Sequence, residues 1–373
     1  MKRRYQFKWF LLLVFALVAV VCTMHFREDR LTLAKKRLRA KGYSVRQAYR
    51  SNPVDQSIID AKAFLKREEL SISQTERYQE KETLEVTSEL NTLAPYVEKL
   101  NCGLTKTRDQ DAAVIGKMHR LRTLCIYGPE LTDQGVAAFS KLKNLEWLEL
   151  YAPQATDEGL NWLQQNDQLS WLFLIDSQVG TQTLQRISSH RKLIRLCLQG
   201  TRVESADLQY LTQLPKLHML ELNGTFIDDQ AAPFLRRMRS LNTLYLSETE
   251  VGDQVCESLT FLPELKELKL DDTLVTNQGI QALLEGCPQL KNLSLRRCDV
   301  SVQAFLQAKA WPVGLEYLSA TGTEITGTEM LALIQRHPSL RIVGYNHRNT
   351  DPAIISQIDK LLHKRSQYSS NGR

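Results

Sequence analysis

The apolar residues of this 373-residue chain follow one template that recurs every 24 or 25 residues. Most units have leucine at their first, fourth and sixth positions, as in Leu217, Leu220 and Leu222. This alternation predicts a short β-strand with one buried face. The repeat thus indicates about eleven stacked copies of one structural unit. The units begin at Val97, Leu121, Leu145, Leu169, Leu193, Leu217, Leu241, Leu265, Leu290, Leu315 and Leu340.

The second half of each unit predicts a turn followed by a helix. A small residue at the ninth position, such as Thr225, can bond the backbone of the turn. The pairs Thr132–Asp133 and Thr156–Asp157 then predict helix starts, with a threonine N-cap and an acidic first turn. A helix is about twice as wide as the ~4.8 Å spacing of paired strands. The stack is therefore expected to curve with its strands on the concave side.

The template L-x-x-L-x-L-x-x-(N/C/T), carried for example by Leu217, Leu220, Leu222 and Thr225, resembles that of the leucine-rich-repeat family. The unit is similar to the cysteine-containing subtype with one helix per repeat, found in bacterial surface proteins and in substrate-recognition subunits of ubiquitin ligases. No F-box-like segment precedes the repeats, so the resemblance favours a membrane-anchored bacterial type. It implies an α/β solenoid, a horseshoe with a parallel concave sheet and convex helices.

Ahead of the repeats, residues 9–24 form an apolar stretch without a charge. A helix there would cover roughly 24 Å, close to a ~30 Å hydrocarbon core. A cleaved signal peptide is the alternative, but no A-x-A motif follows, and Val21 stands where a lipoprotein signal needs a small residue. We therefore predict an uncleaved transmembrane anchor within residues 1–26 of a single-pass membrane protein. Its short basic tail favours export of the repeats, whereas the basic run behind it favours the opposite, so the orientation stays open.

Residues 27–96 are predicted to form a basic juxtamembrane segment and a charged, mainly helical stalk. Leu31, Ala34 and Leu38 would share one face of a helix whose other faces carry cations. Such a helix could lie on anionic lipid or stand in solvent, and the sequence favours neither. The charged stretch 61–90 has no heptad pattern, so no coiled coil is expected.

The repeats are predicted to span residues 97–349 and to end in a C-terminal capping helix and tail over residues 350–373. Pro352 suits the first turn of a helix, and Ile354, Ile358 and Leu361 belong to one apolar face. We expect the tail to be frayed from Arg365 onward.

The formal charge of +6 is concentrated near the N-terminus. From Val97 onward, Lys and Arg number 30 against 31 Asp and Glu. A neutral repeat body argues against a nucleic-acid partner, and cations on both sides of the apolar stretch favour contact with a lipid bilayer through residues 9–24.

Three consecutive strands are predicted to expose aromatic side chains on the concave face. The third, fifth and seventh positions of a repeat have no role in the core, so the residues found there are informative. Aromatic residues around a carboxylate are typical of a binding hot spot, and the carboxylate favours a basic group on the partner. Alternatively, these aromatic residues pack flat on one another or lie beneath the N-terminal stalk. The candidate binding residues are Tyr127, Trp147, Glu149, Tyr151, Trp171 and Phe173.

No pattern typical of catalysis is found. The best nucleophile and base, Cys197 and His218, would lie roughly 10 Å apart along neighbouring strands. The seven cysteines are scattered without metal-ligand spacing, so free thiols and no metal or cofactor are expected. We expect a membrane-anchored, non-enzymatic protein whose concave face binds a protein or peptide. The alternative is an envelope scaffold or self-associating spacer without a specific ligand.

Overall fold

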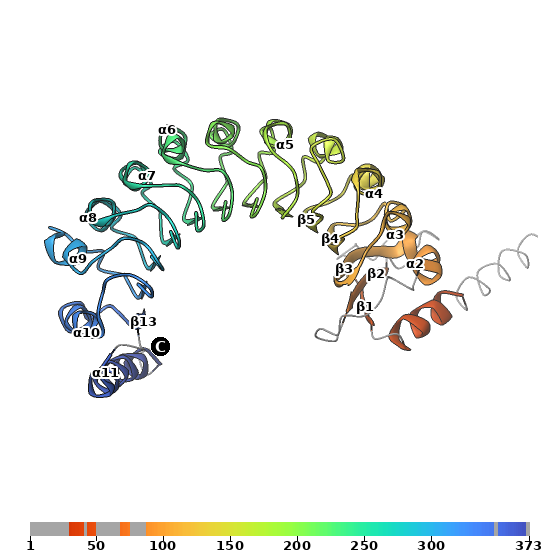
Figure 1. Cartoon of the computed structure of the whole chain (residues 1–373). Helices are drawn as coiled ribbons and strands as arrows, with labels where there is room; N and C mark the ends of the chain where they lie inside the picture. The colour runs from red at the N-terminus through yellow and green to blue at the C-terminus, as the bar shows by residue number, and fades with distance from the viewer. Residues whose placement is uncertain (1–29, 41–42, 50–67, 75–86, 347–349, 371–373) are drawn as a thin grey trace, which may run out of the picture.

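The computed structural model describes residues 30–40, 43–49, 68–74, 87–346 and 350–370. These residues form a curved solenoid in which strands line the inner side of the arc and helices the outer side (Figure 1). Thirteen strands make one sheet in sequence order, from β1 to β13. Every described neighbour pair from β2 to β13 is parallel, and β1 is antiparallel to β2. The predicted parallel concave sheet with convex helices is confirmed.

One strand opens each repeat, and the strands shorten along the chain. The strands are β1 (Tyr43–Tyr49), β2 (Glu68–Gln74), β3 (Val97–Lys106), β4 (Thr123–Tyr127), β5 (Trp147–Tyr151), β6 (Trp171–Ile175), β7 (Arg195–Cys197), β8 (Met219–Glu221), β9 (Thr243–Tyr245), β10 (Glu267–Lys269), β11 (Asn292–Ser294), β12 (Tyr317–Ser319) and β13 (Ile342–Gly344).

Short α- and 3-10 helices follow the strands on the convex side. The α-helices are α2 (Thr87–Leu93), α3 (Asp109–Ile115), α4 (Asp133–Ala137), α5 (Thr181–Ile187), α6 (Ala232–Leu235), α7 (Asp253–Leu259), α8 (Asn277–Gly286), α9 (Gln303–Gln307), α10 (Gly327–Arg336) and α11 (Pro352–Ser370). The 3-10 helices are η2 (Ala94–Tyr96), η3 (Ala138–Lys141), η4 (Asn161–Gln165), η5 (Ser205–Leu211) and η6 (Asp229–Ala231).

The core is one continuous stack of the template leucines. Leu220 and Leu222 are fully buried, as is Ile227 at the eleventh position of the same repeat. The ninth-position threonine bonds the turn as expected, since the hydroxyl of Thr225 donates to the carbonyl of Leu222 at 2.5 Å. Each leucine row is closed only by the repeats on either side, so the repeats stabilise one another.

The threonines expected to cap their own helices act differently. The Thr132 side chain forms no cap bond to α4, and instead its amide and hydroxyl donate to the Asp109 carboxylate of the preceding repeat, at 2.9 and 2.6 Å. Thr156 donates in the same way to Asp133, at 2.7 Å for both bonds, although its oxygen also accepts from the Glu158 amide at 3.2 Å. The threonine N-cap prediction is therefore wrong for Thr132, whose hydroxyl donates to the Asp109 carboxylate and accepts no bond from the amides of α4. These aspartates link successive repeats.

The eighth position of seven consecutive repeats adopts a left-handed backbone, which the template did not reveal. Four of these residues carry side chains, so this conformation costs free energy that the glycines avoid. They are Asp176, Gly200, Gly224, Glu248, Asp272, Arg297 and Gly322, with φ between 54° and 82°.

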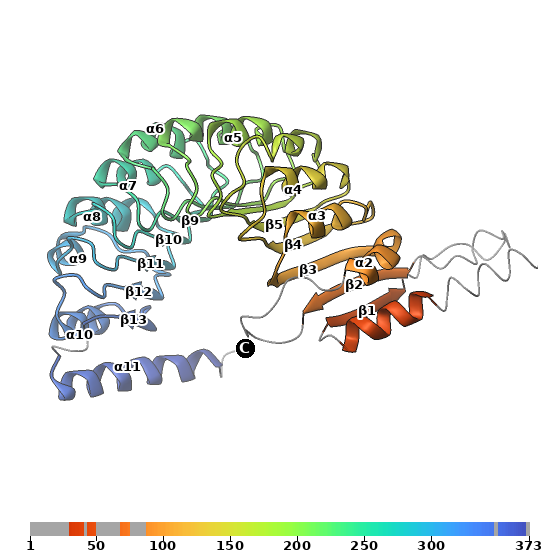
Figure 2. The same cartoon turned by 45° about the vertical axis from the view of Figure 1, so that its right-hand side comes forward.

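The segment ahead of the repeats, residues 27–96, contains two strands that the sequence analysis did not predict. Strands β1 and β2 extend the sheet from the edge of β3, and only residues 30–40 and 87–96 are helical (Figure 2). The first repeat would otherwise leave an unpaired strand edge, which these strands cover. Ala34 and Leu38 are buried in the common core, so the apolar face of their helix is not available to lipid or solvent.

The C-terminal cap is confirmed and is longer than predicted. Helix α11 starts at Pro352, buries Ile358 completely and continues past Arg365 to Ser370. The Arg365 guanidinium donates to the carbonyls of Ile334, His337 and Leu340 at 2.7, 3.2 and 2.9 Å. These carbonyls lie in and after α10, so Arg365 holds the last helix to the last repeat instead of belonging to a frayed tail.

The predicted membrane anchor, residues 9–24, lies outside the described residues. Within the ranges that are described, no helix combines the length and apolar character needed to cross a bilayer.

Candidate functional site

Strands β4, β5 and β6 bring the six predicted binding residues together on the concave face. Pairing in register sets Tyr127 opposite Tyr151, Trp147 opposite Trp171 and Glu149 opposite Phe173. Alternate strand positions point to the same face, so these pairs form three adjoining rows. All six side chains are half-buried. We call these six residues the aromatic patch.

The aromatic rings of the patch stack along the rows. The ring centroids of Trp147 and Trp171 lie 4.1 Å apart with an interplanar angle of 25°, and those of Tyr127 and Tyr151 lie 4.9 Å apart at 22°. Phe173 lies 6.1 Å from both tryptophans. Stacked pairs add about 0.5–1.5 kcal/mol each beyond their buried area, so the patch is ordered before any partner arrives. The expected packing of the aromatic residues on one another is present, and it leaves each ring partly exposed.

The concave side of the patch stays open in the described part of the chain. No described helix or strand crosses the inner side of the arc at β5 in either view (Figures 1 and 2). The described strands ahead of the repeats continue the sheet and do not lie over β4–β6.

Arg195 extends the patch, and the sequence analysis did not identify it. It follows Trp171 in register on β7, and its guanidinium carbon lies 4.1 Å from the centre of the Trp171 ring. An arginine over an indole face is a cation–π contact. This face of the Trp171 ring is therefore occupied by a cation of the chain itself.

Glu149 stands beside a buried thiol. Cys125 is its register partner on β4, and burial, followed by the charge and hydrogen bonding of Glu149, raises the pKa of Cys125 to about 12. The thiol therefore stays neutral and does not neutralise the charge of the Glu149 carboxylate. Among the described residues, Glu149 forms no ion pair.

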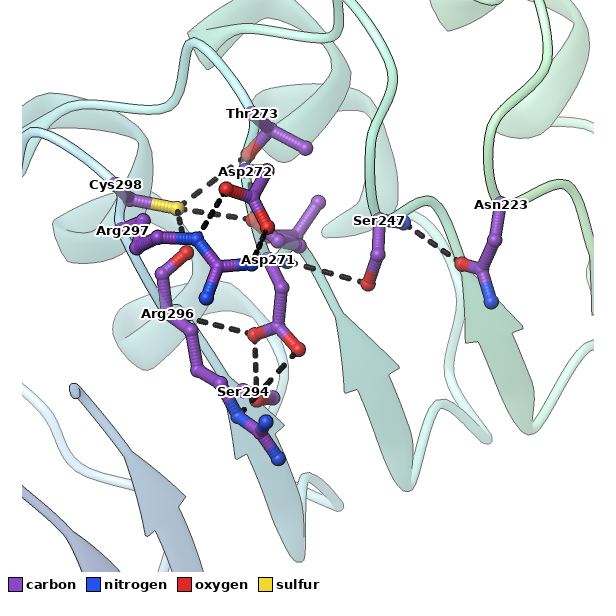
Figure 3. Close-up of polar contacts among 10 residues, drawn as sticks. Asn223, Ser247, Asp271, Asp272, Thr273, Ser294, Arg296, Arg297 and Cys298 are labelled. Atoms are coloured by element: carbon purple, nitrogen blue, oxygen red, sulfur yellow. Dashed lines mark hydrogen bonds and ion pairs between the residues drawn. The ribbon is translucent and has the colours of Figure 1, made fainter. Parts of the chain in front are cut away.

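Further along the arc, charged residues near β10 and β11 form a separate polar network (Figure 3). The Asp271 carboxylate accepts from the Ser294 hydroxyl at 2.5 Å and from the Arg296 amide at 2.8 Å, and its own amide donates to Ser247. On the exposed turn beside it, Arg297 pairs with Asp272. These charges neutralise one another, as expected for a solvated charged stretch.

A hollow of about 350 Å³ lies on the concave face over β10–β12. Its polar groups are also engaged with the chain itself. The Tyr245 hydroxyl donates to Glu267 at 2.6 Å, and the Lys269 amine lies 3.9 Å from the centre of the Tyr245 ring. Burial, and then the bond to Glu267, raise the pKa of Tyr245. The lining residues are Glu267, Leu268, Lys269, Asp271, Asn292, Leu293, Ser294, Arg296, Tyr317 and Ile342.

The six cysteines in the described ranges are buried free thiols. Burial, and next the charge of Glu221, raise the pKa of Cys197 to about 12, so this sulfur is not a thiolate at neutral pH. Its considered base, His218, is exposed and faces the carbonyl of Lys216. Among the described residues, no group of three His, Cys, Asp or Glu side chains could hold a metal ion.

Comparison with known proteins agrees with the repeat geometry. A sequence model described as "FBD-associated F-box protein At5g56370, LRR repeats" matches residues 223–309. The repeats of this chain are leucine-rich repeats. The narrower assignment to a membrane-anchored bacterial type gains no support from this match. No curated protein matches the chain in sequence.

Several solved structures are similar to the chain at low sequence identity. The yeast Rad7–Elc1 complex matches at 18% identity over 71% of this chain and 76% of that chain, with a TM-score of 0.52. An internalin (inlF) from Listeria monocytogenes matches at 17% over 74% and 86%, with a TM-score of 0.49. The plant peptide hormone receptor RGFR1, in complex with RGF2, matches at 14% over 68% and 49%, with a TM-score of 0.42. At such identities the similarity concerns the fold alone.

Proposed function

We propose that this leucine-rich-repeat protein binds another protein or a peptide through the aromatic patch of its concave face. The observation that carries the proposal is the row of stacked, half-exposed aromatic rings on β4–β6 beside a carboxylate without an ion pair in the described chain. Large aromatic side chains in a pre-ordered surface supply most of the binding energy at protein interfaces. The solenoid supplies the rigid frame.

The partner is expected to present a basic side chain. Glu149 can accept a charge-assisted hydrogen bond, and the faces of the surrounding rings favour cations. The position of Arg195 over Trp171 supports this, because the chain itself places a guanidinium on one of these rings. The role is a binding role without catalysis. The protonated state of the Cys197 thiol supports this part of the proposal.

The test is a pull-down from cell extract with the tagged full-length chain and two double variants. Trp147→Ala/Trp171→Ala removes the centre of the patch, while Phe226→Ala/Leu274→Ala removes two exposed apolar side chains outside it, which are 67% and 66% exposed. Each lost tryptophan is expected to cost about 2 kcal/mol, which is about 30-fold in Kd. Circular dichroism checks that both variants fold.

A partner kept by the wild type and the control variant but lost by the tryptophan variant supports the proposal. A partner kept equally by all three contradicts it. Self-association that survives loss of the tryptophans would favour the structural alternative, a scaffold or spacer.

We also propose that residues 9–24 anchor the protein in a membrane as a single span, with the repeats on the exported side. The apolar, uncharged stretch supports the span, and the short basic tail ahead of it supports export of the repeats. The test is carbonate extraction of membranes containing the full-length chain or its Leu13→Arg/Leu17→Arg variant. The wild type should stay with the membrane and the variant should be released. Release of both would contradict the anchor. Protease accessibility of the repeats in intact cells tests the orientation.

A further inference from the structure

The fifth positions of successive strands form a row along the middle of the concave face, and this middle row repeats one order of residue types. The order is cysteine, glutamate and an aromatic residue, on three strands and then again on the next three. Each member pairs in register with the next. The members are Cys125, Glu149, Phe173, Cys197, Glu221 and Tyr245.

The order is confined to the middle row. The neighbouring row at the third position reads Thr123, Trp147, Trp171, Arg195, Met219 and Thr243, with no such period. A simple duplication of three repeats would be expected to reproduce both rows. The side chains of the middle row point to the concave face, so packing of the core does not require their order either. A ligand that contacts the middle row at two places would require this order of residue types to repeat.

The two glutamates have equivalent surroundings. Glu221 faces the buried thiol of Cys197 as Glu149 faces that of Cys125, and each thiol is the register partner on the preceding strand. The Asn223 amide donates to Glu221 at 2.9 Å and fixes its direction. In the described ranges, Glu221 resembles Glu149 in forming no ion pair. Within the described part of the chain, Glu149 and Glu221 are thus two carboxylates of the middle row without an ion pair.

Two cations of the chain lie over aromatic rings of these strands, one on Trp171 in the neighbouring row and one on Tyr245 in the middle row itself. Arg195 lies over Trp171, beside Phe173, and Lys269 lies over Tyr245. Arg195 stands on β7, between the strands of Glu149 and Glu221. Because Arg195 already occupies this face of Trp171, the two carboxylates on either side of its strand are the points of attachment left for basic groups in the middle row.

Glu149 and Glu221 lie on β5 and β8, three strand spacings apart, which is about 14 Å at ~4.8 Å per strand. An extended peptide advances about 3.4 Å per residue, and every second side chain points to the same side. We propose that the middle row binds an extended peptide segment through two basic side chains about four residues apart, one at Glu149 and one at Glu221. This inference rests on the proposed function of the concave face. It adds the spacing between the two basic side chains of the partner and a second contact at Glu221.

The experiment measures binding of synthetic fluorescent peptides to the full-length chain by anisotropy. The peptides are built from Ser, Thr and Val and carry one Arg, or two Arg at i and i+2, i+4 or i+6. The i+4 peptide should bind about fivefold to tenfold more tightly than the others, because only it reaches both carboxylates. Glu221→Gln should remove this advantage and weaken binding of the single-Arg peptide by no more than about twofold, because that peptide can still bind at Glu149. Glu250→Gln, an exposed glutamate outside the row, is the matched control and should change nothing.

The outcomes separate the two proposals. If one- and two-Arg peptides bind alike, and all are lost in Trp147→Ala/Trp171→Ala, the two-point inference fails and the proposed function stands. If the i+4 preference survives Glu221→Gln, the second contact is assigned wrongly. If the wild type binds none of the peptides, the inference is overturned, and the pull-down then decides on the proposed function alone.

Discussion

Replacing Asn166 by leucine is expected to stabilise the protein, because this side chain occupies a core position that other repeats fill with apolar residues. Leu142, Leu214 and Leu262 stand at the same place in their repeats and are buried. Asn166 is fully buried, and neither its side-chain nitrogen nor its oxygen has a hydrogen-bond partner among the described residues. Two polar atoms have therefore lost water without gaining a partner.

The size of the gain can be worked out from the contacts that remain. Leucine has the same number of side-chain heavy atoms as asparagine, so the change needs little repacking. The backbone bonds from Asn166 to Leu163 at 2.8 Å and from Leu169 to Asn166 at 3.2 Å are kept. A buried polar group without a partner costs about 1–3 kcal/mol. We expect the free energy of unfolding to rise by about 2 kcal/mol and the Tm by about 4 °C.

The assay is guanidinium and thermal unfolding followed by circular dichroism, with amide exchange read over the repeat that contains residue 166. Exchange is needed because repeat proteins can unfold in part. The matched control is Leu142→Asn, the reverse change one repeat earlier, which should cost about 3 kcal/mol. A lower unfolding midpoint for Asn166→Leu would refute the reasoning, since it would mean that the amide has a partner in the native protein.

Three further predictions concern stability. Burial lowers the pKa of His190 below its usual 6.5, so the native state binds fewer protons than the unfolded state. The free energy of unfolding should therefore fall as the pH drops below about 7, by at most about 1.4 kcal/mol per pH unit. Guanidinium midpoints measured between pH 5 and 8 should show this slope, and His190→Leu should flatten it. Asp253→Asn should cost about 1 kcal/mol in equilibrium unfolding, because the Thr276 hydroxyl, which donates to Asp253 at 2.6 Å, loses a charged acceptor, whereas Glu250→Asn should be neutral. Arg365→Ala should speed amide exchange in α10 more than in α7, because it frees three carbonyls at the C-terminal end of the solenoid. Equal exchange rates of α10 in the wild type and in Arg365→Ala would argue against this capping role.

The repeat body could be predicted from the sequence because its period leaves one arrangement for the leucines. Leu220 can be buried only when neighbouring repeats stack on it, and the template gives the register of every strand. The N-terminal cap could not be predicted in the same way. Strand β2 (Glu68–Gln74) lies in a charged stretch without the template, and its pairing with β3 depends on an open sheet edge that only the assembled solenoid provides.

The aromatic patch could be predicted because register alone sets Trp147 beside Trp171. Arg195 and Glu221 do not stand out in the composition of a single repeat. For Glu221, the sequence signal is the order of residue types at the fifth position of successive repeats. Arg195 over Trp171 required coordinates, since the reach of a long side chain does not follow from strand register.

The most direct test of the binding role is site-specific photo-cross-linking of the full-length chain in cells. A photoreactive aromatic residue is placed at Phe173, inside the patch, and in a separate variant at Phe226, which is exposed outside it. We predict that position 173 cross-links to another polypeptide carrying basic residues near the contact, and that position 226 does not. Cross-links from position 173 only to the chain's own N-terminal segment would contradict the account, because the patch would then be a covered internal surface.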